Sequence, residues 1–311
     1  MLLIKILSVF LIIIAGIFIR KKGLISPITI KETSIVITKV FYPSLIFSSF
    51  LKNFNFSDLT KNSLLPIGTF LIMLCGYIYG FIFSKILPFK NEKEKNTFHF
   101  QCTINNYSFL PLPIILFLFG ERYVPLLILS TFGSEISVWT IGILALTGNK
   151  FERKSLKNLL SIPMISILIS VLIIFFKDIL VIKNEILVET GKSILNVLNL
   201  MGNATIPIAL FIAGAKMGEV EFKNLFNFKY LFLSFLRLIL IPLTSISLFN
   251  LFSFPYEIKK VLFVVAIMPT AIASIVLSSA FESDSKFAAE SVLLTHLLSL
   301  ITIPIFLSFL K

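Results

Sequence analysis

The chain has 311 residues, of which 57% are hydrophobic and only 14% are charged. Because soluble domains carry about 25% charged residues, this composition excludes a soluble globular enzyme, a disordered chain and a nucleic-acid-binding protein. The mean hydropathy of +0.97 indicates an all-α, polytopic membrane protein surrounded by lipid. Its formal net charge of +12 then reflects basic residues that flank membrane spans.

Apolar runs bounded by charged residues predict about ten membrane-spanning helices. The first is interpreted as an uncleaved anchor, because Arg20, Lys21 and Lys22 follow its apolar run. Residues 148–157 are expected to form a short basic connector on the cytoplasmic side. The expected spans are residues 2–19, 33–51, 63–86, 97–119, 123–147, 158–176, 188–214, 228–251, 258–281 and 286–310.

Lysine and arginine residues are divided unevenly between the two sets of connections. One set holds 16 of them and the opposite set holds 10. Because cytoplasmic connections are enriched in these residues, the sequence predicts a protein of the cytoplasmic membrane with both termini on the non-cytoplasmic side.

Matching proline positions divide the chain into two halves, residues 1–147 and 158–311. The offset of 164 residues between Pro43 and Pro207 also places Asn105 of the fourth span on Pro269 of the ninth. Because each half has five spans, the second half crosses the membrane in the opposite direction, as in the inverted repeats of many transporters. The alternative is coincidence, since prolines are frequent in transmembrane helices.

Two stretches at corresponding positions are expected to interrupt their helices, residues 105–113 and residues 268–274. Proline removes a backbone donor and clashes with the preceding turn, and the freed groups are tolerated only against protein or a wet cavity. If the two broken spans cross, two partly positive helix N-termini meet near the midplane. Such a point favours an anionic group, for instance a carboxylate, or a polar solute. Two kinked helices with ordinary packing roles are the alternative.

Seven residues at the depth of these interruptions are candidates for substrate binding. They are either polar or helix-breaking, and they come from both halves of the chain. They are Asn105, Asn106, Pro111, Pro113, Pro269, Thr270 and Ser274.

Ionisable residues inside the spans form a second candidate group. A charge at the bilayer centre costs about 2.5–3.5 kcal/mol, so Glu135 and Arg237 are expected to face the protein interior. They either bind a coupling ion, sodium or a proton, or form a structural ion pair. His296 titrates near neutral pH when unperturbed, so it is a further coupling candidate, with a packed, hydrogen-bonded histidine as the alternative. No other cofactor and no metal site is expected.

Four motifs, in order along nearly the whole chain, resemble those of the auxin efflux carrier family, which includes bacterial malate permease-type carriers and plant PIN proteins. They are Asn106 to Pro113, residues 201–210 closed by Gly214, Met268-Pro269, and residues 299–304. The resemblance implies a five-plus-five inverted repeat with crossed, discontinuous fourth and ninth spans, an elevator-type motion and a homodimer. It also implies a scaffold of spans 1, 2, 6 and 7 and a transport domain of spans 3–5 and 8–10.

Three residues depart from the family pattern. Pro111 stands where glycine is frequent, His296 where a small hydroxyl residue is common, and Ser274 where plant members have a second proline. These departures leave the substrate and the coupling ion open.

The sequence therefore predicts a secondary active transporter for a small organic anion. The alternative is a membrane receptor that binds a solute without moving it. An intramembrane enzyme is disfavoured because the chain has no HExxH, GxSxG or aspartate-rich metal motif, and ATP-driven pumping because it has no GxxxxGK[ST] loop.

Overall fold

The computed structural model describes residues 2–148, 160–179, 185–219 and 227–309. Within these ranges the secondary structure is entirely helical, so the predicted all-α class is confirmed. The basic connector predicted over residues 148–157 lies outside the described residues, apart from Gly148.

The first half of the chain forms nine α-helices within the described residues, joined in places by short π- or 3₁₀-helical turns. The turns are η1 (Ile37–Phe41), η2 (Glu121–Tyr123) and η3 (Val138–Gly142). The helices are α1 (Leu2–Lys21), α2 (Pro27–Val36), α3 (Tyr42–Asn53), α4 (Phe56–Lys61), α5 (Leu64–Ile86), α6 (Glu92–Thr103), α7 (Pro111–Phe119), α8 (Val124–Ser137) and α9 (Ile143–Leu146).

The described part of the second half follows a similar order. A single π-helical turn, η5 (Leu236–Leu240), joins two of its helices. The helices are α11 (Ile162–Ile179), α12 (Glu185–Asn203), α13 (Thr205–Met217), α14 (Phe228–Phe235), α15 (Ile241–Leu251), α16 (Tyr256–Ala266), α17 (Ser274–Ala280) and α18 (Ser285–Ser308).

Among the described residues, six helical stretches are long and apolar enough to cross a membrane. The predicted fourth and ninth spans are not among them, because each is divided into two shorter helices. The chain is therefore a multi-pass membrane protein. The six stretches are Pro27–Asn53, Phe56–Ile86, Glu121–Leu146, Glu189–Met217, Phe228–Leu251 and Ser285–Ser308.

The two prolines that suggested a repeat occupy similar local positions. Pro43 lies in the first turn of α3, directly after the π-helical turn η1, and Pro207 lies in the first turn of α13, after the boundary at Ala204. Proline is tolerated in a first turn because its missing N–H has no partner there in any case. Both prolines thus follow a local irregularity of their span.

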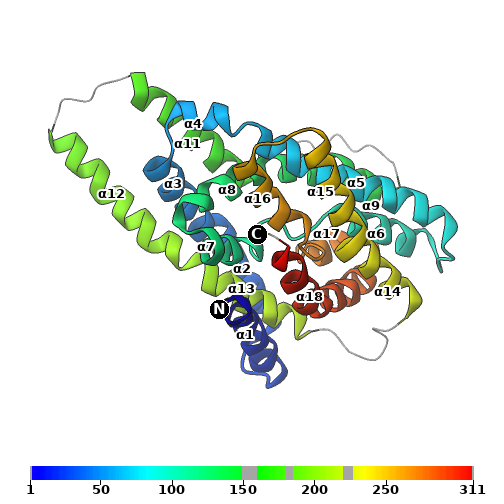
Figure 1. The fold of residues 1–311 in the computed structure, drawn as a ribbon. Coiled ribbons are helices and arrows are strands. Elements are labelled where there is room, and N and C mark those ends of the chain that lie inside the picture. Colours follow the sequence, from blue (N-terminus) through cyan, green and yellow to red (C-terminus); the bar gives the residue numbers. More distant parts are fainter. Residues whose placement is uncertain (1, 149–159, 180–184, 220–226, 310–311) are drawn as a thin grey trace.

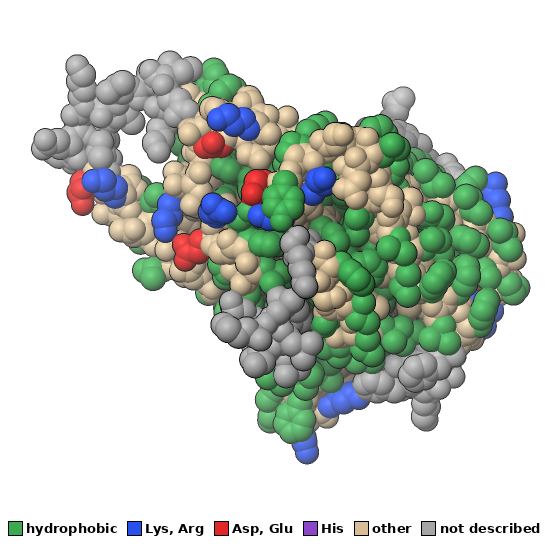
Figure 2. Space-filling view, in the orientation of Figure 1, with side chains coloured by type: hydrophobic (Ala, Val, Ile, Leu, Met, Phe, Trp, Pro, Cys, Tyr) green, Lys and Arg blue, Asp and Glu red, His purple; other side chains and the backbone are tan. Residues whose placement is uncertain are grey.

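Figure 1 shows α12 along one outer edge of the molecule, whereas α5, α6 and α14 lie towards the opposite edge, with α7, α8 and α16 between them. Figure 2 shows hydrophobic side chains over the face formed by α14, α15 and α5, with few charges among them. Such a surface suits contact with lipid chains.

Helices α1 and α13 pack with their backbones in close contact. A Cβ atom on Gly16 would lie 2.1 Å from the carbonyl oxygen of Phe211, and one on Gly214 would lie 2.0 Å from that of Ile13. Small residues allow this approach, which stabilises helix pairs in membranes where apolar burial alone cannot. The reciprocal pair of glycines therefore fixes α1 against α13.

We predict that Gly214→Val separates α1 from α13 and lowers the free energy of unfolding by about 1–3 kcal/mol. Thermal unfolding of the purified protein in detergent measures this loss. Gly191→Ala on α12 is the control, because a Cβ there meets no atom within 4 Å; its stability should stay equal or rise slightly. Equal stability of Gly214→Val and the unchanged protein would contradict the packing described for α1 and α13.

Candidate functional site

Both stretches predicted to break a helix do so, with boundaries shifted along the chain. The interruptions cover residues 104–110, between α6 and α7, and residues 267–273, between α16 and α17. Pro111 and Pro113 were expected inside the first break, but they lie in the first turn of α7. Likewise Ser274 is the first residue of α17. The fixed backbone angle of proline favours the start of a helix, so prolines end the break rather than fill it.

The two interruptions contact each other through their backbones. Asn105 and Thr270 form an isolated antiparallel bridge. Beside it, the N–H of Asn106 donates to the carbonyl oxygen of Pro269 over 2.7 Å, and the N–H of Ala271 donates to that of Ile104 over 3.2 Å. Each break thus supplies partners for backbone groups that the other leaves free, as the membrane interior requires.

Polar side chains add further contacts at the crossing. The Asn105 amide nitrogen donates to the carbonyl oxygen of Val265 over 2.6 Å, whereas its side-chain oxygen is buried without a hydrogen-bond partner. The hydroxyl groups of Thr270 and Thr295 lie 2.8 Å apart. Since Thr295 belongs to α18, this helix holds the second interruption from outside the crossing.

Ser274 is linked to the other half of the chain by a glutamine that is not among the predicted site residues. Gln101 of α6 donates from Nε2 to the Ser274 hydroxyl oxygen over 2.9 Å and to the carbonyl oxygen of Ala288 over 3.1 Å. Its own oxygen is buried without a partner. A polar residue in an apolar span was the available signal for Gln101, and the same signal applied to Thr295.

Arg237 lies at the ends of the two half-helices that lead into the crossing. Its side chain is fully buried, and its two terminal nitrogens donate to the carbonyl oxygens of Cys102 (3.3 Å) and Ala266 (3.0 Å). These residues belong to the last turns of α6 and α16. Each helix C-terminus carries roughly half a negative charge, so together they balance one guanidinium group.

Glu135 lies elsewhere and does not pair with Arg237. The structural ion pair that the sequence left open as an alternative is therefore not formed. Its two carboxylate oxygens accept hydrogen bonds from the hydroxyl of Tyr107 over 2.9 Å and from Nε1 of Trp139 over 3.2 Å. Tyr107 belongs to the first interruption, so the carboxylate contacts the crossing through a single side chain. Glu135, Tyr107 and Trp139 are only partly buried.

His296 of α18 also contacts the first interruption. Its Nε2 atom lies 3.3 Å from the amide nitrogen of Asn106. The side chains of Asn106 and His296 are 5% and 3% exposed, and Asn105 and Thr270 are fully buried. In this conformation these four side chains are closed off from the surface.

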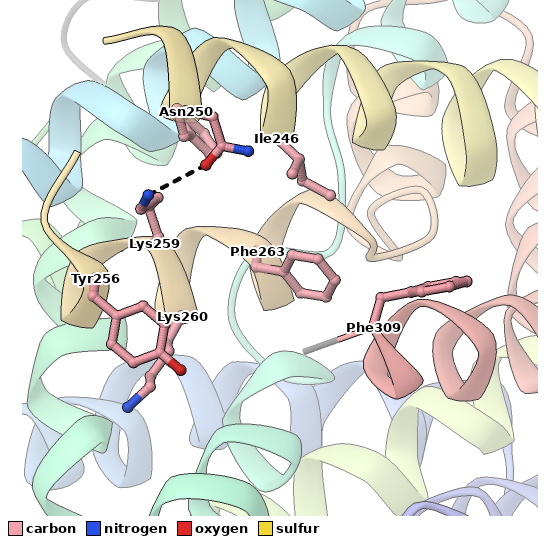
Figure 3. A pocket seen from close by; sticks show the side chains of 8 residues that line it. Ile246, Asn250, Tyr256, Lys259, Lys260, Phe263 and Phe309 are labelled. Atoms are coloured by element: carbon pink, nitrogen blue, oxygen red, sulfur yellow. Dashed lines mark hydrogen bonds between the residues drawn. The ribbon is translucent and has the colours of Figure 1, made fainter. Parts of the chain in front are cut away.

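A surface hollow lies apart from the crossing, between α15, α16 and the end of α18 (Figure 3). Phe263 and Phe309 line its apolar part, and Lys259 donates to the side-chain oxygen of Asn250 over 3.2 Å at its rim. None of the ten predicted site residues lines this hollow.

Comparison with known proteins identifies the family of the chain. The model of the membrane transport protein family matches residues 1–307, so the chain belongs to this family, the auxin efflux carriers. A curated relative described as an uncharacterized transporter of Methanocaldococcus jannaschii is 27% identical over 307 residues, which cover 96% of each chain. The family is one of membrane transporters and not of enzymes.

We predict that Arg237→Met destabilises the protein by about 2–5 kcal/mol, because the carbonyl groups at two helix ends lose their only charged partner among the described residues. Arg237→Lys keeps the charge but cannot reach both carbonyls as a fork, so its loss should be intermediate. Thermal unfolding in detergent measures both variants. The control is Arg122→Ala, which removes an exposed arginine and should cost less than about 0.5 kcal/mol. An Arg237→Met protein as stable as the control would contradict a structural role for this arginine.

Proposed function

We propose that this member of the membrane transport protein family is a secondary active transporter that moves a small organic anion, such as a carboxylate, across the cytoplasmic membrane. The observation that carries the proposal is the contact between two interrupted helices amid buried polar side chains. Broken helices that meet inside a membrane protein are the usual construction of a solute site in secondary transporters.

An anion is the favoured substrate for electrostatic reasons. The positive end of α7 begins at the first interruption, and Arg237 neutralises the negative ends of α6 and α16, which would otherwise repel an anion. Asn106 has a second amide proton that can donate to a carboxylate oxygen. The described hydrogen bonds of the predicted substrate-binding residues include no acidic side chain that would compete with an anion.

The packing between the halves supports a ten-span, inverted-repeat architecture. Helix α1 of span 1 packs on α13 of span 7, and α11 of span 6 packs on α3 of span 2. If spans 1 and 2 correspond to spans 6 and 7, these two contacts are equivalent. The interruptions at 104–110 and 267–273 are equally long. We infer a scaffold of spans 1, 2, 6 and 7 that carries a transport domain of spans 3–5 and 8–10, with an elevator-type motion opening the closed crossing to either side.

An exposed apolar helix face supports an oligomer, and the distribution of basic residues supports an orientation in the membrane. Helix α12 lies along an outer edge of the molecule, and its apolar side chains Ile194, Val197 and Leu200 are exposed. Such a face suits a second copy of the chain, so we infer a homodimer. The excess of basic residues in one set of connections supports termini on the non-cytoplasmic side.

Glu135 is the coupling residue that the contacts favour. Arg237 is held by two helix ends and therefore serves the structure of the crossing. Glu135, in contrast, is a partly buried carboxylate whose link to the crossing is the Tyr107 hydroxyl. A proton or a sodium ion bound by Glu135 would change this hydrogen bond, and thereby the position of the first interruption.

Uptake of radiolabelled organic acids into proteoliposomes tests the substrate site. We predict that Asn106→Ala and Pro269→Ala lower the initial rate roughly tenfold or more, because each removes a contact or a conformational constraint at the crossing. The matched controls are Asn250→Ala in the surface hollow and Pro255→Ala at the start of α16, whose rates should stay within about twofold. Undiminished uptake in both crossing variants would reject the site. Binding without uptake in the unchanged protein would favour a receptor.

A second measurement separates coupling from binding. We predict that Glu135→Gln abolishes accumulation driven by a proton or sodium gradient but retains exchange of external labelled anion for internal unlabelled anion. The reason is that exchange needs a mobile substrate site but no coupled ion. Glu121→Gln, an exposed carboxylate, is the control and should behave like the unchanged protein. Gradient-driven accumulation that persists in Glu135→Gln would exclude this carboxylate as the coupling site.

A further inference from the structure

A chain of three hydrogen bonds links α18 to the start of α7 through His296 and Asn106. The Nδ1 atom of His296 lies 2.8 Å from the carbonyl oxygen of Val292, and its Nε2 atom lies 3.3 Å from Nδ2 of Asn106. On the far side of Asn106, the N–H of Leu110 donates to Oδ1 over 3.4 Å. All three links are buried.

Both ends of this chain are backbone groups, so the direction of every bond is fixed. The Val292 carbonyl can only accept, and therefore Nδ1 of His296 carries the ring proton. The Leu110 N–H can only donate, and therefore the oxygen of Asn106 faces it and the NH₂ group faces the histidine. Nε2 must accept from Asn106, which only a neutral imidazole can do.

A proton on Nε2 would place two donors face to face. Rotation of the Asn106 amide would relieve that clash, but it would turn the NH₂ group towards the Leu110 N–H and create another. Asn106 cannot easily move away, since its own N–H donates to the carbonyl oxygen of Pro269 over 2.7 Å. The surrounding bonds thus favour one tautomer and the uncharged ring.

Several charged side chains on α18 and on the helices packed against it are engaged with other groups, whereas Lys93 and Lys286 lie in the first turns of α6 and α18. Arg237 of η5 binds the two helix ends. On α18 itself, Glu290 accepts a hydrogen bond from Tyr230 of α14. Further pairs that occupy charges of α14, α6, α13 and α1 are Lys229–Glu94, Lys95–Glu92, Lys216–Glu219 and Arg20–Glu219.

We propose that His296 is a positioning residue and not a proton carrier: as a neutral imidazole it orients the Asn106 amide so that the second N–H of Nδ2 stays available as a donor to the transported anion. This inference rests on the proposed anion transport, and it replaces the coupling role predicted for His296 from sequence. His296 is then the residue that makes the crossing favour substrates with acceptor oxygens.

Two substitutions of the same histidine test the positioning role. Glutamine places an acceptor near the position of Nε2, whereas asparagine reaches only the position of Nδ1. We expect His296→Asn to raise the KM for the anion roughly tenfold with little change in maximal rate, and His296→Gln to stay within about threefold. The control is His99→Gln, which alters the other buried histidine of the chain and should leave KM unchanged. Equal KM values for His296→Asn and the unchanged protein would overturn the proposal.

The ring itself can be observed directly, even if the asparagine variant does not fold. The chain has two histidines, so His99→Gln leaves His296 as the only imidazole in a protein purified without a histidine tag. We expect ¹⁵N NMR in proteoliposomes to show the neutral Nδ1–H tautomer from about pH 6 to 8. Protonation within that range, or the Nε2–H tautomer, would overturn the proposal.

The two proposals fail in different ways. If the unchanged protein moves no organic anion, the proposed function fails, whatever the histidine spectrum shows. If it moves an anion with the same KM in all His296 variants, only the positioning role fails.

Discussion

In a bilayer, an interrupted helix is stable only if other polar groups take over the hydrogen bonds that it gives up. Here each interruption supplies hydrogen-bond partners for the backbone of the other. The antiparallel bridge between Asn105 and Thr270, with the bonds from Asn106 to Pro269 and from Ala271 to Ile104, pairs backbone groups that would otherwise face an apolar interior. Because neither break can satisfy these groups alone, the two must remain together, and the surrounding helices are arranged around that requirement.

Two side-chain arrangements reinforce this pairing. Arg237 neutralises the negative ends of α6 and α16, where the chain enters the crossing. In addition, the adjacent residues Thr295 and His296 of the continuous helix α18 contact one interruption each. The charge of Arg237 and the directed hydrogen bonds from α18 therefore both stabilise the crossing.

The sequence predicted the positions of the interruptions because proline leaves a strong local signal. It misplaced their limits, because the same ring that disfavours a helix interior favours a helix start, and Pro111 and Pro113 therefore belong to α7. Residue type also identified Arg237 and Glu135 as charges within the predicted spans. It did not identify their partners, since the carbonyls of Cys102 and Ala266 and the hydroxyl of Tyr107 come together only through tertiary packing. Gln101 and Thr295 were missed for that same reason.

The indole of Trp139 donates to the Glu135 carboxylate over 3.2 Å, and it is the one tryptophan of the chain. Indole emission depends on nearby charge and hydrogen bonding, so the protein contains a built-in optical reporter at this carboxylate. Fluorescence of the unlabelled protein can therefore follow the state of Glu135 in real time, without an attached dye and without any knowledge of the substrate.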